Sequence, residues 1–234
     1  TNRVAQVASQ AGARWLPKGG GGDAAAYRDK LHYRDGDGRL DLPLPRMAGQ
    51  HQAQNAALAV AMLRAQHALA VPETAIRAAM RWADWPARLQ HIGEGPLADR
   101  LPDGSELWLD GGHNPAAGRA ISDHFRGHVA AGRPFHIILG MLSNKDAAGF
   151  LKPFGGRTTT VHGVPVPDHE HHAPAELAAI ARANGMAGFA DGDFGAALDW
   201  IARHADRTQP PVVLIAGSLY LAGEVLAANG TLPH

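Results

Sequence analysis

The sequence contains no cysteine among its 234 residues. This absence excludes a disulfide framework, a thiolate nucleophile and a zinc site built on cysteine. The chain also lacks net charge, because 22 Lys and Arg residues balance 22 Asp and Glu residues when histidine is neutral. Without a basic excess, nothing in the composition indicates binding to nucleic acid or to an anionic membrane. We therefore expect the partner to be a small molecule or a protein.

Long apolar runs are missing as well. The chain has no run of about 18 apolar residues and no secretory signal with an apolar core, so we expect a cytoplasmic protein. A chain of 234 residues can bury a proper core, which suggests one large domain, alone or with a piece of another. Since the sequence opens at Thr1 in a helical pattern, we expect a fragment or a processed chain.

The first 46 residues predict a small separate region. A short helix is expected first, then the glycine-rich turn "KGGGGD", and then a hairpin in "YRDKLHYRDGDGRLDLPLP". The two Asp-Gly pairs of this segment supply the positive φ angles that tight turns need. Pro43 and Pro45 interrupt any strand that follows, which favours a linker. We therefore predict one domain over 1–46 and a second over 47–234.

The second region predicts a doubly wound α/β domain. Two helices are expected in "HQAQNAALAVAMLRAQHAL" and "PETAIRAAMRW", from the spacing of their apolar residues. After them, short β-branched runs such as "ELWLD", "FHIILG" and "VVLIAG" alternate with helical segments. This alternation requires crossover helices and hence a mostly parallel, Rossmann-like sheet covered on both faces. Ligands of such sheets bind beyond the carboxyl ends of the strands.

The stretch "DGGHNP" ends one of these strands and opens a helix. Its glycines allow the backbone to approach a ligand closely, Pro115 suits the first turn of a helix, and Asn114 can cap that helix. Asp110 and His113 would then face the crevice beyond the sheet. The alternative is a glycine-rich turn in which Asn114 caps the helix and His113 has no role.

Four further positions are candidates on similar grounds. Ser218 follows the last strand and precedes a helix, where a hydroxyl can bind an anion or simply cap the helix. Lys145 and Asp146 follow another strand, and Lys145 could face a phosphate or the solvent. Asn55 stands in an alanine-rich helical segment, either for a functional reason or as a cap before Ala56.

The stretch "VPDHEHHAP" gathers five acidic and histidine residues at 168–172. Adjacent histidines on a loop do not converge easily on one ion, and the spacing of a helical His-x-x-x-His pair is missing there. We therefore predict a loop before a helix that starts near Pro174, and we assign no metal ligands in the chain.

Five motifs taken together, "GQHQAQNAALAVA", "WPARLQ", "DGGHNP", "GMLSNKD" and "GSLYLAGEVL", resemble the folylpolyglutamate synthase and dihydrofolate synthase branch of the Mur ligases. The resemblance extends over essentially the whole chain. It implies an ATP-dependent ligase that adds L-glutamate to dihydropteroate or folate through an acyl phosphate, with Mg²⁺ offsetting the phosphate charge. It also implies a monomer that binds only these small molecules.

The resemblance also implies roles for single residues. Asn55, Arg88 and Asp110 would contact ATP, and His113 and Ser218 would hold the incoming glutamate, with Asp110 and His113 as the catalytic pair. It assigns no role to Lys145 and Asp146. On the same basis, residues 1–46 are the tail of the central ATP-binding domain, and residues 47–234 are the glutamate-binding C-terminal domain.

Several departures from the family pattern qualify this prediction. No G-x-x-x-x-G-K-[ST] phosphate loop occurs in the sequence, so ATP and Mg²⁺ would be held largely by a missing amino-terminal part and the chain should be inactive alone. Gly112 stands where alanine is usual, and Ala87 where glycine is common. The alternatives are a peptidoglycan or cyanophycin ligase of the same superfamily, or a non-catalytic α/β binding module.

Overall fold

The computed structural model describes residues 2–13, 15–17 and 22–232, and it contains two compact units. The first unit comprises the described residues up to 46 together with 50–84. The second unit comprises 47–49 and the described residues from 85 onward. Within the described part of the chain, no helix is both long and apolar enough to cross a bilayer.

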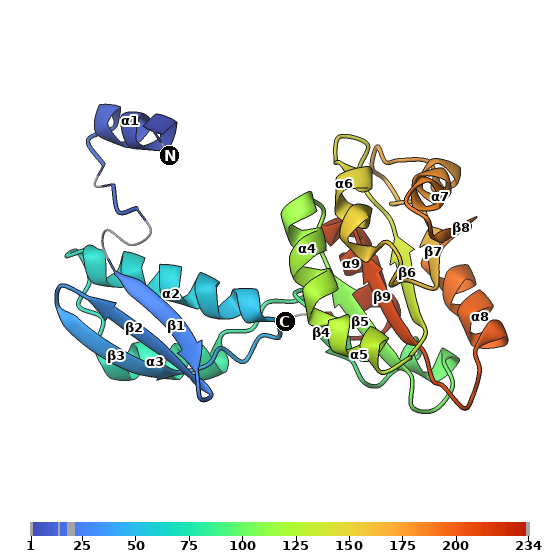
Figure 1. The fold of residues 1–234 in the computed structure, drawn as a ribbon, viewed down its shortest axis with the longest axis horizontal. Coiled ribbons are helices and arrows are strands. Elements are labelled where there is room, and N and C mark those ends of the chain that lie inside the picture. The colour runs from blue at the N-terminus through green and yellow to red at the C-terminus, as the bar shows by residue number, and fades with distance from the viewer. Residues whose placement is uncertain (1, 14, 18–21, 233–234) are drawn as a thin grey trace. The chain divides into compact units, whose positions relative to one another are not determined.

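The first unit, in its described residues, packs two helices on an antiparallel sheet of three strands (Figure 1). The tight turn between the second and third strands pairs Asp35 with Gly38, at the Asp-Gly repeat that predicted a hairpin. Apolar side chains from the sheet, such as Leu31 and Leu42, share one core with Val60 and Ile76 of the helices. The elements are α1 (Asn2–Gln10), β1 (Asp23–Tyr27), β2 (Lys30–Asp35), β3 (Gly38–Pro43), α2 (Gln50–Ala65) and α3 (Glu73–Trp82).

The predicted domain boundary after residue 46 is wrong. Helices α2 and α3 belong to the first unit, so the second unit takes up the chain again only at Trp85. The physical reason is that Val60, Ile76 and Met80 bury their side chains against the small sheet. The spacing of apolar residues predicted both helices correctly, but it does not indicate which sheet receives their apolar faces.

The second unit contains the predicted mostly parallel sheet. Its six strands lie in the order β4-β5-β9-β6-β7-β8, and β4 alone among them runs antiparallel to its neighbour. The register places the carboxyl ends of three central strands side by side, because Ala216 pairs with both Asp110 and Leu139. The strands are β4 (Gln90–Ile92), β5 (Glu106–Asp110), β6 (Phe135–Leu139), β7 (Thr160–Gly163), β8 (Ala187–Ala190) and β9 (Val212–Ala216).

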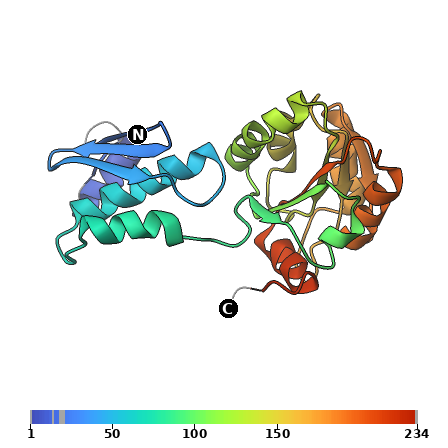
Figure 2. The ribbon, with the colours of Figure 1, turned by 90° about the horizontal axis from the view of Figure 1, so that it is seen from below.

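Helices cover both faces of this sheet, as Figures 1 and 2 show. One core packs residues of α4, α6 and α7 against the sheet, and a second core packs α8 and α9 on the other side. The doubly wound α/β class expected from the sequence is therefore confirmed. The helices are α4 (Pro115–His124), α5 (Arg126–Ala130), α6 (Ala147–Leu151), α7 (Pro174–Ala183), α8 (Phe194–His204) and α9 (Leu219–Ala228), with short 3-10 turns at Ala98–Arg100 and Lys152–Phe154.

A chain of four polar side chains runs through the buried part of this sheet. His136 Nδ1 lies 2.7 Å from Thr160 Oγ1, which lies 2.9 Å from His162 Nε2, and His162 Nδ1 lies 2.9 Å from Asp191 Oδ2. With both rings neutral, His136 donates to Thr160, Thr160 donates to His162, and His162 donates to the Asp191 carboxylate. Each hydrogen of the chain then has one acceptor, and a proton on His162 Nε2 would remove the acceptor of the Thr160 hydroxyl.

Candidate functional site

The candidate site is the carboxyl edge of the parallel sheet in the second unit. Here the strands β5, β9 and β6 end at the same level. Asp110 is the last residue of β5, and Gly217 and Gly140 directly follow β9 and β6. Gly217 has a φ of 109°, and a Cβ there would lie 2.5 Å from the carbonyl oxygen of Gly140. Only glycine fits such a turn, so the ends of β9 and β6 are held in direct contact.

Asp110 is buried, with 4% of its surface exposed, and both of its carboxylate oxygens bind backbone. Oδ2 accepts a hydrogen bond from the amide of Leu89 at 2.8 Å, and Oδ1 accepts one from the amide of Gly112 at 2.6 Å. The carboxylate thereby joins the loop after β5 to the segment before β4. Its first function in the fold is to hold these two segments together.

Arg88 is displayed by an unusual backbone segment. Its two neighbours, Ala87 and Leu89, are both buried and have φ angles of 56° and 44°, in the left-handed region. Three hydrogen bonds fix this segment, since the Ala87 amide donates to Gln90 Oε1, the Gly111 amide donates to the Ala87 carbonyl, and Leu89 binds Asp110. The half-buried Arg88 side chain is thus anchored beside the Asp110 loop.

Alanine at position 87, where the resemblance leads us to expect glycine, occupies a positive φ angle, yet we expect Ala87→Gly to change stability by less than about 1 kcal/mol. Relief of the strained backbone favours glycine by roughly 1 kcal/mol, whereas loss of a fully buried methyl group costs about 0.8 kcal/mol. Urea unfolding of the two proteins would measure the difference. A stabilisation of several kcal/mol would show that strain at this position dominates.

Gly112, the other departure, is required by its surroundings. A Cβ at this position would lie 2.7 Å from Asp110 Oδ1 and 2.9 Å from the Cβ of Ala117. An alanine here would therefore push on the carboxylate that accepts the Gly112 amide. The loop after β5 is accordingly built around glycine in this chain.

His113 and Asn114 have different roles at the start of α4. Asn114 Oδ1 accepts the Ala117 amide at 2.9 Å, so the predicted capping role of Asn114 is confirmed, and Pro115 forms the first turn. His113 is only half-buried, and its Nδ1 lies 2.9 Å from the Gly111 carbonyl. Because a carbonyl only accepts, Nδ1 carries the hydrogen, so Nε2 is an acceptor in the uncharged tautomer of the ring.

Ser218 caps α9 beside this loop. Its Oγ accepts the Tyr220 amide at 3.1 Å, and only 4% of the residue is exposed. The hydroxyl hydrogen can still be donated to a ligand, in the positive field of the helix N-terminus. Since Ser218 and Asp110 follow neighbouring strands, they lie on the same edge of the sheet.

Asn55 is the one candidate in the first unit. It lies within α2 and is exposed, and its Nδ2 donates to Gln52 Oε1 at 3.0 Å. The alternative that it caps a helix starting at Ala56 is wrong, because α2 begins at Gln50. The structure therefore brings together Arg88, Asp110, His113 and Ser218, while Asn55 belongs to the other unit.

The loops after β6 and β7 complete this edge. Asp146 caps α6 by accepting the Gly149 amide at 2.8 Å, and the Lys145 carbonyl accepts a hydrogen bond from His172 Nε2 at 2.9 Å. Burial has the largest single effect and lowers the pKa of the His172 imidazole. The hydrogen bond to the Lys145 carbonyl and the nearby Glu176 carboxylate together raise this pKa by more, so that it lies above its ordinary value. Through its bond to the Lys145 carbonyl, His172 thus ties the loops after β6 and β7 together.

The histidines at 169–172 are engaged with the protein itself. His169 and His171 bind the carbonyls of Pro167 and His169 through Nδ1, and the His169 ring stacks on Tyr220 with centroids 3.6 Å apart. Over the described ranges 2–13, 15–17 and 22–232, no three acidic or histidine side chains are grouped so that they could hold a metal ion.

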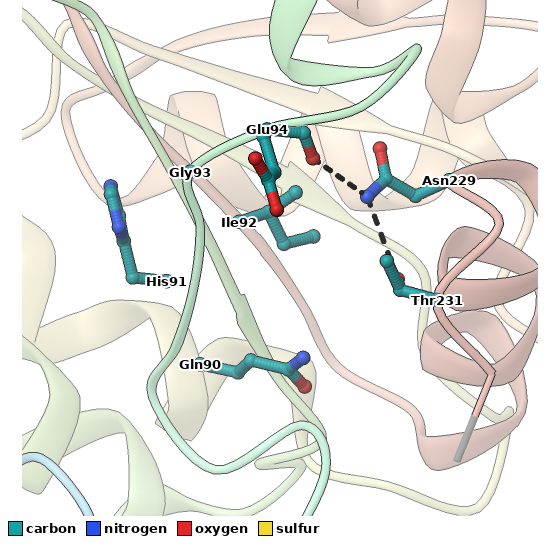
Figure 3. A pocket seen from close by; sticks show the side chains of 7 residues that line it. All are labelled: Gln90, His91, Ile92, Gly93, Glu94, Asn229 and Thr231. Carbon is teal, nitrogen blue, oxygen red and sulfur yellow. Dashed lines mark hydrogen bonds between the residues drawn. The ribbon is translucent and has the colours of Figure 1, made fainter. Parts of the chain in front are cut away.

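A separate hollow of about 420 Å³ lies beside the edge strand β4 (Figure 3). Asn229 spans it, donating from Nδ2 to the Glu94 carbonyl at 3.0 Å and accepting the Leu97 amide at 3.1 Å. These bonds tie the end of α9 to the segment after β4. We therefore assign a structural role to Asn229.

The sequence did not indicate the residues that support Asp110 and Arg88. Leu89 contributes a buried amide, and Gln90 contributes a side-chain oxygen to the turn at Ala87. Neither has a chemically distinctive side chain at a strand end. The one available signal was the alanine at position 87, where the family pattern has glycine.

The family of the dihydrofolate synthetase C-terminal domain matches residues 98–228, which is more than half of the chain. The chain belongs to this family. A folylpolyglutamate synthase of Lacticaseibacillus casei is 29% identical over 242 aligned residues, which cover 95% of this chain and 50% of the relative.

Solved structures give the same result. The bifunctional folylpolyglutamate synthase/dihydrofolate synthase of Yersinia pestis has a TM-score of 0.74 at 26% identity, covering 96% of this chain and 49% of its own. An E. coli FolC structure in complex with DHPP and ADP has a TM-score of 0.75 at 26% identity, with the same coverage. The chain thus spans about half the length of the proteins it matches.

Proposed function

We propose that this chain is the glutamate-binding part of an ATP-dependent ligase that joins L-glutamate to dihydropteroate or folate. The observation that carries the proposal is the grouping of Arg88, Asp110, His113 and Ser218 at the carboxyl edge of one parallel sheet. The family match favours the folate branch over peptidoglycan and cyanophycin ligases. Related structures that contain ADP, or Mn, AMPPNP and L-glutamate, support the same choice of ligands.

The two residues proposed to bind glutamate differ in what they offer. Ser218 can donate its hydroxyl hydrogen to a carboxylate at the positive end of α9. His113 can accept a hydrogen bond through Nε2, which suits the amino group of the same substrate. Together they would orient the glutamate amine toward the second substrate, and positioning of this kind accounts for much of the rate of such reactions.

On the nucleotide side, the guanidinium of Arg88 is suited to phosphate oxygens. The contact of Asn55 with ATP stays a prediction from the sequence. Asp110 would contact the nucleotide with a carboxylate that already accepts two backbone amides. ATP, when bound, supplies the phosphoryl group that converts a poor carboxylate electrophile into an acyl phosphate. We place Mg²⁺ and the greater part of the ATP site in the half of the enzyme that this chain does not span, and we expect the chain to be inactive alone.

A chimera tests the proposed function. In it, this chain replaces the matching half of the L. casei folylpolyglutamate synthase. We expect ADP release from ATP only when L-glutamate and dihydropteroate or a folate are both present. A folded chimera that binds ATP but turns over none of these substrates would overturn the proposal.

In this chimera, Ser218→Ala should raise the KM for glutamate roughly 10-fold, because a hydrogen bond to a charged group is lost. The same change should lower stability by about 1 kcal/mol through loss of the helix cap. Asp193→Ala is the matched control, since Asp193 caps another helix, α8, by accepting the Ala196 amide at 2.7 Å. Equal KM values for the two variants would show that Ser218 is only a cap.

A further inference from the structure

Two loops of the second unit meet at His172, on the carboxyl edge of the sheet. One loop follows β6 and leads into α6, and the other follows β7 and leads into α7. The amide of His172 donates to the Met141 carbonyl at 2.9 Å, which joins the two loops through their backbones. The amide of Ser143 joins them again by donating to the Glu170 carbonyl at 3.2 Å. Neither bond involves Lys145, near the end of the first loop.

The imidazole of His172 adds a third link, between two groups that only accept hydrogen bonds. Its Nε2 lies 2.9 Å from the carbonyl oxygen of Lys145, and its Nδ1 lies 3.0 Å from a carboxylate oxygen of Glu176. Only 13% of the His172 side chain is exposed. A neutral imidazole has one N–H group and can satisfy one of the two acceptors, whereas the doubly protonated ring satisfies both. The surroundings of the ring therefore fit its cation.

The neutral ring would give up the bond to Lys145. A hydrogen bond to a carboxylate is stronger than one to a carbonyl, so the remaining hydrogen stays on Nδ1, toward Glu176. Nε2 then directs a lone pair at the carbonyl oxygen of Lys145, and the two lone pairs repel each other. Loss of one proton thus removes the side-chain link between the two loops, while their backbone bonds remain.

The bond from His172 helps to fix a short turn at Lys145. The amide of Lys145 donates to the Leu142 carbonyl at 3.0 Å. Its carbonyl also accepts the amide of Ala147, the first residue of α6, at 3.1 Å. Lys145 is half-buried, and it follows β6, the neighbour of β9, so it lies on the same edge of the sheet as Ser218. The His172 ring therefore holds the backbone of a cationic residue at the candidate site.

Several titratable side chains lie on the elements around the ring. They are Glu176 on α7, Asp168, His169, Glu170 and His171 on the loop after β7, and Lys145 and Asp146 on the loop after β6. Burial has the largest single effect on the pKa of His172 and lowers it, but the Lys145 carbonyl and the Glu176 carboxylate raise this pKa above its ordinary value of 6.5. Loss of the second proton is therefore centred above pH 6.5.

We infer that the His172 ring, with Lys145 and Glu176, forms a pH-dependent latch: the doubly protonated ring holds the Lys145 turn at the carboxyl edge, and loss of one proton releases the turn. His172 is then a positioning residue, which acts through Lys145. Because Lys145 lies on the edge where we propose that glutamate binds, the latch makes the ligation depend on pH, and this last step rests on the proposed function.

The first experiment follows hydrogen exchange in the chain itself from about pH 6 to about pH 9, corrected for the intrinsic rate. As His172 loses its proton, we expect the protection of the Lys145 and Ala147 amides to fall roughly 10-fold, because a hydrogen bond from a charged group is lost. The amides of Ser143 and His172 lie in the same two loops and should keep their protection. At the acidic end, nuclear magnetic resonance should show both ring nitrogens of His172 protonated.

Three variants make this experiment specific. Glu176→Gln keeps an acceptor oxygen but removes the negative charge, so the pKa of His172 should fall and the release should shift to lower pH. His172→Gln retains a side-chain N–H that does not titrate, so the pH-dependent step should disappear. His171→Gln is the matched control, since the His171 ring binds the His169 carbonyl, and it should keep the wild-type midpoint.

Three results of the first experiment would overturn the inference. Protection of the Lys145 turn could stay constant while His172 titrates. The wild-type protein and Glu176→Gln could release the turn at the same pH. The His172 ring could carry a single proton over the whole range.

The second experiment measures the KM for L-glutamate in the chimera over the same pH range. We expect KM to rise several-fold as the turn is released, because a cation near the anionic substrate loses its fixed position, and to rise at lower pH in Glu176→Gln. Titration of the substrate amine is common to both proteins, so the difference between the two profiles isolates His172. An active chimera with coinciding profiles would overturn the inference. An inactive chimera would contradict the proposed function, and hydrogen exchange would then decide on the latch.

Discussion

Replacing Asp110 with alanine is expected to lower the free energy of unfolding of the second unit by about 3 kcal/mol. The carboxylate accepts two backbone amides in a buried position, and each amide left without an acceptor costs about 1 to 3 kcal/mol. Hydrogen exchange of the slowest amides in β5 and β9 would measure the change for this unit separately. Because the Leu89 bond is lost, the segment that displays Arg88 should also exchange faster.

Two comparisons make this prediction specific. Asp110→Asn keeps one acceptor oxygen, so it should cost less than Asp110→Ala. Asp146→Ala also removes a carboxylate that accepts a backbone amide, but at an exposed helix cap, and it should cost only about 1 kcal/mol. Equal effects of the two alanine variants would show that burial of Asp110 contributes nothing.

Acidification from pH 7 to pH 5 is expected to lower the stability of the second unit by about 2 kcal/mol through His136 alone. Burial, assisted by the neighbouring His162, lowers the pKa of His136 from 6.5 to about 4. Between these two pH values, the unfolded chain therefore binds a proton at His136 and the folded protein does not. The contribution of His136 to the free energy of unfolding is thus present above pH 6.5 and is lost as the pH falls toward 4. Burial also lowers the pKa of His162, although Asp191 opposes it, which adds a loss of the same sign.

The raised pKa of His172 acts in the opposite direction, since its contribution is present below pH 6.5 and is lost as the pH rises. A variant separates these effects. His136→Asn retains a side-chain N–H for Thr160 but does not titrate. The slope of the free energy of unfolding against pH should therefore decrease by the part that His136 contributes. Hydrogen exchange of Ile137 and Val161, corrected for the intrinsic rate, gives that slope. An unchanged slope would contradict the assignment to His136.

Much of the fold could be predicted from the sequence, because the alternation of β-branched runs and helical segments after residue 105 follows from local periodicity. The assignment of α2 and α3 to the first unit could not be predicted, since apolar spacing defines a face but not its partner. The sequence predicts an antiparallel neighbour of β5 within "GPLADRLPDGSELWLD", with a turn at 102–104, whereas the strand that pairs with β5 is β4 at Gln90–Ile92. Three residues are too few to show a period. The identity of β4 depends on pairing with β5.

For the candidate site, residues with distinctive chemistry at strand ends were found, and the structure places Asp110 and Ser218 on neighbouring strands. Their engagement with the backbone could not be predicted. The carboxylate of Asp110 binds the amide of Leu89, 21 residues away, and no local pattern shows a contact of this kind. The roles of Asn55, Arg88, Asp110, His113 and Ser218 toward ligands stay predictions.

The two outermost strands of the second unit's sheet are short, with three residues in β4 and four in β8. An exposed edge offers unpaired N–H and C=O groups along its length, which is how sheets of different molecules join into aggregates. Edges of three and four residues provide few such groups. The apolar, tightly paired strands in the middle of the sheet are thereby shielded from pairing with other molecules, even in a concentrated solution.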